Sequence, residues 1–203
     1  VGIYLKSKKF EKSLGGMLSK MLVSMESRGP DSAGFAIYNS DKNKIYKYSI
    51  CLNEMSFEKF KKEIKNKVKI TNIEKNSDHV ILKSIEKPNK ILPILEDFST
   101  ISLVGYGKSI EIFKQVGNPR TVVKKFNLDS FSGTHAIGHT RMATESAITT
   151  DGSHPYSTGE DECLVHNGSL SNHNNLRRKL KKSGSKFSSD NDTEVAAGYI
   201  SDS

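Results

Sequence analysis

The chain has 203 residues, of which 35% are hydrophobic and 27% charged, and its formal net charge is +8. This length suits one ordinary domain or a large part of a bigger one. No stretch of the sequence approaches the roughly 20 apolar residues that a membrane-spanning helix needs, and the first residues do not form a basic-then-apolar leader. We therefore expect a soluble, cytoplasmic protein without a membrane partner.

The first half of the sequence alternates between strand and helix patterns. Residues 1–5 predict a short strand, and apolar residues recur at helical spacing over 10–25. Glycine and proline in SRGPDSAG (27–34) end that helix. Strand-like runs at 35–39 and 44–52 surround a polar turn, which predicts a hairpin.

The middle of the chain continues with a lysine-rich surface helix at 55–67 and two strands at 68–74 and 79–86. Residues 86–93 have the composition of a turn-rich joint. Residues 101–117 predict a strand, ISLVGYG, that runs directly into a helix, SIEIFKQVG.

Residues 133–200 have a different composition, rich in Gly, His, Thr, Ser and Asn. Two short strands are expected at 135–142 and 163–168, together with two helices, the second beginning near Asp192. Strands that end in polar residues are typical of a site built at strand ends.

The positive charge is concentrated in two segments, 57–69 and 177–186. Both resemble the solvated faces of amphipathic helices, and no arginine–aromatic interleaving accompanies them. We therefore expect no nucleic-acid partner, although the +8 charge leaves nucleic-acid binding as a weaker hypothesis.

Two cysteines, Cys51 and Cys163, are too few for a disulfide framework and sit in apolar, strand-like settings. The simplest interpretation is that both are small buried thiols. Neither has zinc-ligand spacing to another Cys or to a His. We predict no metal site and no cofactor.

Four polar segments contain groups suited to an amino-acid substrate: RGPDSAG (28–34), GHTRMATES (138–146), HNGSLSNH (166–173) and SDNDTEV (189–195). An arginine at a strand end, Arg141, can bind a carboxylate through two parallel hydrogen bonds. Asp192 at a helix start can accept hydrogen bonds from an ammonium group.

The Asn167–Gly168 pair can offer a side-chain amide and a backbone N–H to one oxygen. Each of these groups also has a structural interpretation when taken alone. An Asn-Gly pair is a common turn, Asp192 can be a helix cap, and Arg141 can belong to an ion pair.

Other polar residues of these segments have structural interpretations too. Arg28 with Asp31 can brace a turn. His139 and His166 alternate with apolar neighbours, which is more typical of buried core histidines than of ligands. Spacing alone assembles neither a Ser-His-Asp triad nor a metal site.

Together and in this order, the four segments resemble the class II glutamine amidotransferases, whose nucleophile is the N-terminal residue. That family includes the glutaminase domains of glutamate synthase, asparagine synthetase, amidophosphoribosyltransferase and glucosamine-6-phosphate synthase. The chain is most similar to stand-alone amidotransferase subunits of glutamate-synthase-related complexes, such as the N-methylglutamate synthase type. The resemblance covers residues 1–38 and about 100–200, and it is weak over 45–98.

The resemblance implies an α+β fold, the four-layer α/β/β/α sandwich of N-terminal-nucleophile hydrolases. Residues 1–203 would form one amidotransferase domain that is incomplete at both ends. The implied reaction hydrolyses glutamine to glutamate and ammonia through a cysteinyl thioester. The ammonia would pass to a partner synthase, and any flavin or iron–sulfur cluster would belong to that partner.

The resemblance also implies a role for individual residues. Arg141 would hold the α-carboxylate of glutamine and Asp192 its α-ammonium group, with Thr144 lining the same pocket. Three further residues would support catalysis. Asn167 and the N–H of Gly168 would form the oxyanion hole, and Arg28 would help to order the nucleophile.

The sequence departs from the family pattern at its start. The family nucleophile is an N-terminal cysteine whose free α-amine is the general base, whereas this chain begins with Val1. In one alignment Val1-Gly2-Ile3 replaces Cys-Gly-Ile, and the protein is a catalytically dead homologue that binds glutamine or acts as a scaffold. In the other alignment Cys-Gly-Ile lies upstream of Val1, and the spacing from Val1 to Arg28 favours this second alignment. Met142 replaces an aromatic residue found in several relatives.

Overall fold

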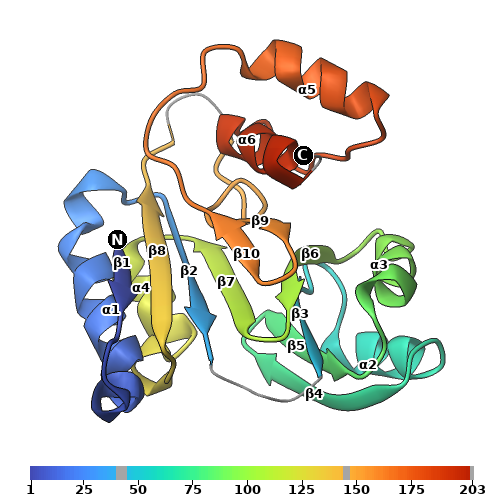
Figure 1. The fold of residues 1–203 in the computed structure, drawn as a ribbon, viewed down its shortest axis with the longest axis horizontal. Coiled ribbons are helices and arrows are strands. Elements are labelled where there is room, and N and C mark those ends of the chain that lie inside the picture. Colours follow the sequence, from blue (N-terminus) through green and yellow to red (C-terminus); the bar gives the residue numbers. More distant parts are fainter. Residues whose placement is uncertain (40–44, 144–146, 202–203) are drawn as a thin grey trace.

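The computed structural model describes residues 1–39, 45–143 and 147–201. These residues form two four-stranded sheets and a two-stranded ribbon, with helices packed against them (Figure 1). All strand pairs within the three sheets are antiparallel.

The first sheet has the strand order β1-β8-β2-β7. Its strands are β1 (Gly2–Tyr4), β8 (His135–Arg141), β2 (Ser32–Tyr38) and β7 (Ile110–Val116). The predicted strand at the start of the chain is therefore confirmed, and it pairs with a strand from the polar C-terminal part. This pairing brings the beginning of the chain next to the GHTRM segment.

The second sheet has the strand order β4-β5-β3-β6. Its strands are β4 (Ile70–Asn76), β5 (His79–Ser84), β3 (Tyr46–Cys51) and β6 (Ser102–Gly107). The predicted hairpin of β2 with β3 is wrong, because these strands belong to different sheets. Strands β4 and β5, which were both expected, do form a hairpin.

Helices cover the first sheet through one hydrophobic cluster. This cluster joins Leu14, Leu18 and Leu22 of α1 (Leu14–Ser24) and Val122 of α4 (Pro119–Lys125) to Phe35 of β2. A 3-10 turn, Lys8–Ser13, precedes α1, so the predicted helix begins later than expected. The apolar stripe read from the sequence is therefore the face that α1 buries.

A second cluster joins the other sheet to α2 (Phe57–Lys65) and α3 (Pro88–Glu96). Phe60 and Ile64 are the buried residues of α2, while Lys59, Lys62 and Lys65 are exposed, as the sequence predicted. The side chain of Ser56 accepts a hydrogen bond from the Lys59 N–H and so caps the start of α2.

A third cluster contains residues of both sheets, among them Ala36 of β2, Cys51 of β3, Val104 of β6 and Ile112 of β7. Strand β2 thus buries alternate residues on its two faces, Phe35 toward the helices and Ala36 toward the second sheet. The prediction of an α+β fold is confirmed. The narrower assignment to the four-layer hydrolase sandwich stays a prediction.

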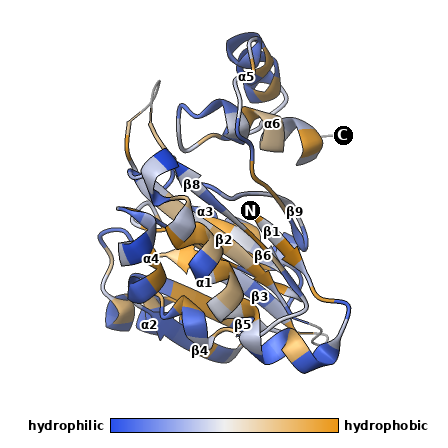
Figure 2. Cartoon of the chain, turned by 90° about the vertical axis from the view of Figure 1, so that its left-hand side faces the viewer, coloured by the Kyte–Doolittle hydropathy of each residue, from blue (hydrophilic) through white to orange (hydrophobic). Residues whose placement is uncertain are grey.

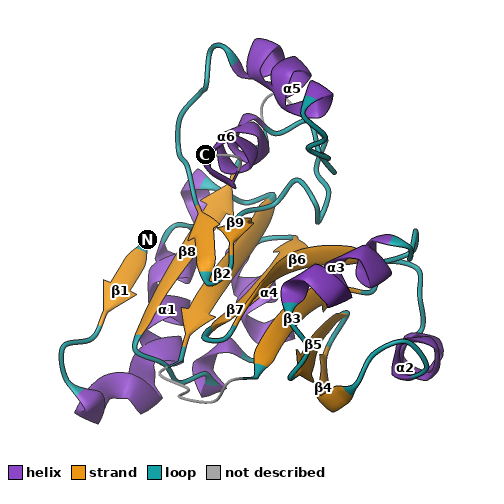
Figure 3. Ribbon diagram, turned by 45° about the vertical axis from the view of Figure 1, so that its right-hand side comes forward, coloured by secondary structure: helices purple, strands orange, loops and turns teal. Residues whose placement is uncertain are grey.

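The C-terminal part begins with the ribbon of β9 (Tyr156–Gly159) and β10 (Glu162–Leu164). Two helices follow, α5 (His173–Lys182) and α6 (Asp192–Ser201), and they lie beyond the end of β8 (Figure 3). Helix α6 begins at the residue that the sequence predicted. Helix α5 is hydrophilic over most of its surface, as Figure 2 shows.

Two further predictions about the elements are wrong. The segment 109–117 is not a helix but contains β7, whose Ile112 faces the second sheet while Phe113 faces the helices. Because both faces are buried, the sequence lacks the alternation that marks a half-exposed strand. The supposed joint at 86–93 contains most of α3, and Pro88 occupies its first turn, where a missing N–H costs no hydrogen bond. Within the described ranges, no helix combines the length and the apolar character needed to cross a membrane.

Candidate active site

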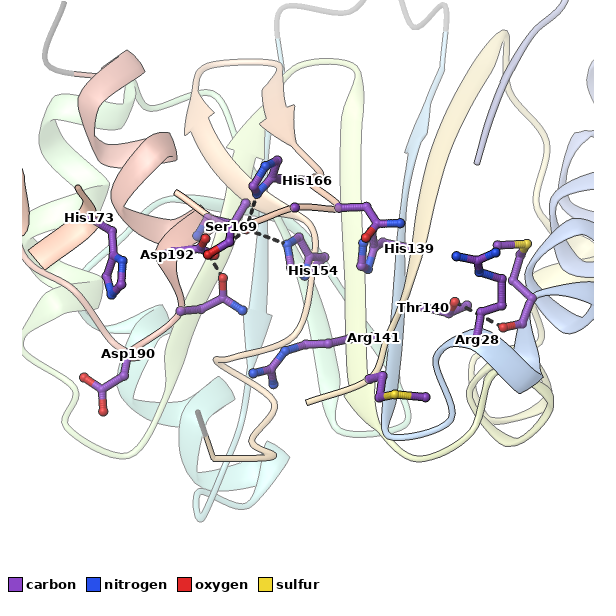
Figure 4. A pocket seen from close by; sticks show the side chains of 16 residues that line it. Arg28, His139, Thr140, Arg141, His154, His166, Ser169, His173, Asp190 and Asp192 are labelled. Atoms are coloured by element: carbon purple, nitrogen blue, oxygen red, sulfur yellow. Dashed lines mark hydrogen bonds between the residues drawn. The ribbon is translucent and has the colours of Figure 1, made fainter. Parts of the chain in front are cut away.

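A pocket of about 440 Å³ lies where the end of β8 meets the start of α6. It is lined by Arg28, Arg141, Asn167, Gly168 and Asp192, all of which the sequence singled out (Figure 4). Its volume is in the range typical of small-molecule sites. Residues more than 160 positions apart in the chain therefore meet in one cavity.

The sixth predicted residue, Thr144, lies outside the described residues. Its neighbours at the end of β8 do line the pocket, namely Thr140, Arg141 and Met142. Met142 is 52% exposed, so it lines the pocket at its rim.

Strand β8 positions Arg141 as its last residue. The residue is only 7% exposed, and its guanidinium Nη1 donates a hydrogen bond to the carbonyl of Ala147 at 3.3 Å. A buried guanidinium has little rotational freedom once it is bonded in this way, so the orientation of Arg141 at the pocket wall is fixed.

Arg28 reaches the pocket because its segment packs closely on β8. A Cβ on Gly29 would lie 2.4 Å from the carbonyl carbon of Thr140, so only glycine permits this approach. The Asp31 N–H donates to the Arg141 carbonyl at 3.0 Å, and the Asp31 carboxylate accepts from the Ala143 N–H at 2.8 Å. Asp31 therefore braces the turn, as its structural interpretation held, while the exposed Arg28 lines the pocket.

The Asn167–Gly168 pair follows β10 and is exposed at the pocket wall. A Cβ on Gly168 would lie 2.8 Å from Nε2 of His166, so the imidazole ring packs directly on this glycine. A side chain at position 168 would require the ring or the loop to move, and the backbone at this position is open to the pocket.

Helix α6 contributes Asp192 as its first residue. One carboxylate oxygen, Oδ2, accepts a hydrogen bond from the Leu170 N–H at 2.6 Å, which joins the start of the helix to the loop that follows Gly168. In the view of Figure 4, Asp190 and Asp192 lie to one side, Arg28 lies to the other, and Arg141 lies between them. The pocket thus contains both signs of charge in separate places.

Four histidines also line the pocket: His139, His154, His166 and His173. The rings of His139 and His154 are stacked, with centroids 4.1 Å apart. The interpretation of His139 and His166 as core histidines is therefore incomplete, because both face the cavity. The sequence analysis missed His154, which lies outside the four segments, and no periodicity distinguishes it.

Burial keeps two of these histidines neutral. It lowers the pKa of His139 to about 4, opposed by a hydrogen bond to the main chain of His166. Burial also lowers the pKa of His154 to about 2, with a further contribution from His139. Both rings are therefore uncharged near pH 7 and act in the pocket as hydrogen-bonding groups.

The first residue of the chain lies beside this site. The α-amino group of Val1 donates to the Gly138 carbonyl at 2.9 Å, and the Gly138 N–H donates to the Val1 carbonyl at the same distance. Strand β1 continues this pairing with Gly2 opposite Ile137. The backbone of β1 is therefore aligned with the part of β8 that leads to Arg141.

The two cysteines lie outside this pocket. Cys51 is buried and Cys163 is partly buried, and desolvation raises the pKa of both thiols, that of Cys163 to about 11. Among the described residues, ligand atoms of Cys51, Asp78 and His79 lie within 4.8 Å of one another. The Asp78 carboxylate already accepts hydrogen bonds from His79 and from Lys125 at 2.8 Å, so its charge is compensated within the protein.

Known proteins with sequences similar to this chain include glutamine amidotransferases. Residues 129–201 match the family described as "Glutamine amidotransferase domain". The chain is 45% identical over 204 residues to "Glutamine amidotransferase-like protein GlxB" of Rhizobium meliloti (strain 1021), covering 98% of this chain and 68% of that protein. It is 36% identical over 124 residues to "Glutamine--fructose-6-phosphate aminotransferase [isomerizing]" of Methanococcus maripaludis, covering 57% of this chain and 20% of that protein. The chain belongs to the class II glutamine amidotransferases.

Proposed function

We propose that this protein hydrolyses glutamine to glutamate and ammonia through a thioester with an N-terminal cysteine. The observation that carries the proposal is the single pocket in which Arg141, Asp192 and the Asn167–Gly168 pair meet. Family membership supports the same reaction class, and the distribution of charge in the pocket supports the substrate.

Glutamine is a zwitterion at its α-carbon, and the pocket offers a partner for each charge. The guanidinium of Arg141 binds the α-carboxylate, since a planar fork can donate two parallel hydrogen bonds to it. Asp192 accepts from the α-ammonium group while its Oδ2 is held by the Leu170 N–H. Thr144, which lies outside the described residues, is the third residue that we propose binds glutamine. Fixing both ends of the amino acid directs its side-chain amide toward the loop at 167–168.

The side-chain amide of Asn167 and the N–H of Gly168 stabilise the oxyanion that forms when the amide carbon is attacked. Such donors act mainly on the transition state, and the loss of one typically costs about 10²–10³-fold in rate. Arg28, on the opposite side of the pocket from Asp190 and Asp192 in Figure 4, orders the nucleophile.

The pairing of β1 with β8 supports a nucleophile three residues upstream of Val1. Gly2 lies opposite Ile137, so Val1 lies opposite Gly138, which packs toward Leu18 and Leu22 of α1. In the same register, the third residue before Val1 would lie opposite Arg141. Directly opposed residues share one face of a sheet, so a cysteine there would face the pocket, whereas Val1 faces the helix.

We further infer that the domain has the four-layer α/β/β/α arrangement of N-terminal-nucleophile hydrolases and extends beyond residues 1–203. Two antiparallel sheets that share one cluster, with helices clustered on each, support this fold. Ammonia released in the pocket passes to a partner synthase in glutamine-dependent nitrogen metabolism, the partner being of the glutamate-synthase-related type.

The test is glutamine hydrolysis by the full-length protein with its natural N-terminus, assayed for glutamate and ammonia with and without proteins that co-purify with it. We expect hydrolysis that requires an N-terminal cysteine and is lost when that cysteine becomes serine or alanine. Binding of glutamine without turnover would instead support the non-catalytic homologue, and absence of both would refute the assignment of the pocket.

A further inference from the structure

The hydroxyl of Thr193 lies at a junction between the two halves of the pocket. Its Oγ1 is 3.0 Å from Nε2 of His154, 3.4 Å from Nδ1 of His166 and 3.3 Å from Oδ1 of Asp192. Thr193 is only 1% exposed, so none of these contacts is shared with bulk water. One side chain therefore touches the proposed ammonium site and the residue before the proposed oxyanion loop.

The chemistry of a hydroxyl fixes the direction of these three bonds. A hydroxyl has one hydrogen to donate and two lone pairs that accept, whereas a carboxylate can only accept. Thr193 therefore donates to Asp192, and it accepts from both imidazole rings. His154 must carry its proton on Nε2 and His166 must carry its proton on Nδ1.

The tautomer assigned to His154 agrees with the surroundings of its ring. Nδ1 of His154, which this assignment leaves unprotonated, is buried without a hydrogen-bond partner in the described part of the chain. Nε2 of His166, across the ring from the Nδ1 that contacts Thr193, is the atom nearest to the Cβ position of Gly168, at 2.8 Å. The ring that Thr193 holds is thus the ring that packs on Gly168.

The backbone of Thr193 is anchored independently of its hydroxyl. Its N–H donates to Oδ1 of Asn191 at 2.8 Å, and Arg177 donates to the carbonyls of Ser189 and Asn191. The carboxylate of Glu194 accepts from the N–H and the hydroxyl of Ser189. Removing the Thr193 hydroxyl therefore leaves the start of α6 in place.

We propose that Thr193 is a positioning residue that couples the ammonium-binding carboxylate of Asp192 to the oxyanion loop through the ring of His166. This inference rests on the proposed glutaminase function. Thr193 acts through its neighbours: its hydroxyl fixes the Asp192 carboxylate and, through His166, the backbone of Gly168. The Asp192 carboxylate and the Gly168 N–H therefore keep a fixed distance and orientation relative to each other.

The test compares Thr193→Val, which replaces the hydroxyl by a methyl group of similar size, with Thr193→Ser, which retains the hydroxyl. Thr158→Val is the matched control, because Thr158 is a similarly buried threonine on β9 outside the pocket. All variants are made in the full-length protein. Histidine tautomers are read from ¹⁵N NMR of the rings without ligand, assigned with His154→Gln and His166→Gln, and kcat and KM for glutamine are measured separately.

We expect Thr193→Ser and Thr158→Val to keep the wild-type tautomers and a kcat/KM within about 3-fold of wild type. We expect Thr193→Val to lose the Nδ1–H tautomer of His166, to raise KM and to lower kcat, so that kcat/KM falls by about 10- to 100-fold. Thr193→Val with unchanged tautomers and kinetics would overturn the inference, as would Thr193→Ser being as impaired as Thr193→Val.

The two proposals fail in different ways. Wild-type protein that shows the assigned tautomers but does not hydrolyse glutamine would refute the proposed function, and with it the role of Thr193. Wild-type protein that hydrolyses glutamine while His166 carries its proton on Nε2 would refute only the role of Thr193.

Discussion

Replacing Gly168 by alanine perturbs the proposed oxyanion loop at one defined contact. The added Cβ would lie 2.8 Å from Nε2 and 3.2 Å from Cε1 of the His166 ring, whereas ordinary contact begins at 3.4 Å. The ring or the loop must therefore move by about 0.6 Å, the shortfall between these two distances. Because Thr193 holds the ring from its other side, we expect the loop to move.

A shift of this size takes the Gly168 N–H away from the position where the oxyanion forms. Misplacement by about 1 Å can cost about 10²-fold in rate, and oxyanion donors act mainly on the transition state. We therefore expect Gly168→Ala to lower kcat by about 100-fold and to change KM by only a few-fold. The backbone at Gly168 is not left-handed, so the effect comes from the contact and not from strain.

The assay is glutamate release by the full-length protein over a range of glutamine concentrations. Gly16→Ala in α1 is the matched control, since the nearest atom to its Cβ would be 3.8 Å away, and its kinetics should equal those of wild type. A Gly168→Ala protein whose kcat is within threefold of wild type would contradict the assignment of this N–H to the oxyanion hole.

Three further predictions concern substrate binding and stability. Arg141→Lys keeps the charge but loses the planar guanidinium, so we expect KM for glutamine to rise by about 10- to 100-fold with a smaller change in kcat. Arg120→Lys is the control, because the side chain of Arg120 is 59% exposed, and it should change neither constant. Gly29→Ala would place a Cβ 2.4 Å from backbone atoms of Thr140, and we expect thermal denaturation to show a loss of about 1–3 kcal/mol and kcat/KM to fall as Arg28 is displaced. Because the pKa values of His139 and His154 are lowered to about 4 and about 2, the unfolded chain binds protons that the folded chain excludes. The free energy of unfolding is therefore highest above about pH 6.5 and falls as pH falls, with a limiting slope of about 2.7 kcal/mol per pH unit near pH 5 for the two groups. Urea unfolding at several pH values measures this slope, and His154→Gln should reduce the contribution of the two histidines to it by about half. A slope that is unchanged in His154→Gln would refute the assignment.

Sequence patterns predicted elements well where one face of an element is exposed. The apolar stripe of α1 and the lysine-rich outer face of α2 are examples, because solvent on one side imposes a period on the sequence. Strand β7 was misjudged since Ile112 and Phe113 are buried on opposite faces, which removes that period. The partners of β2 and β3 also depend on contacts between distant segments that no local pattern records.

Only some residues of the candidate site could be predicted from the sequence. Arg141, Asn167, Gly168 and Asp192 lie in segments whose order identified the family, and the structure places them in one pocket. Thr193 was not singled out, because its role depends on three partners brought together only by the fold.

The central claim is that a nucleophilic cysteine precedes Val1 and faces this pocket. The most direct measurement is the mass of the N-terminal peptide of the protein from its natural source, before and after treatment with a diazoketone analogue of glutamine. We predict a peptide that begins with cysteine, three residues before Val1, and that gains the mass of the analogue minus the N₂ that leaves when the cysteine sulfur bonds to the diazo carbon. A mature protein that begins at Val1, or an N-terminal cysteine that the analogue leaves unmodified, would contradict the account.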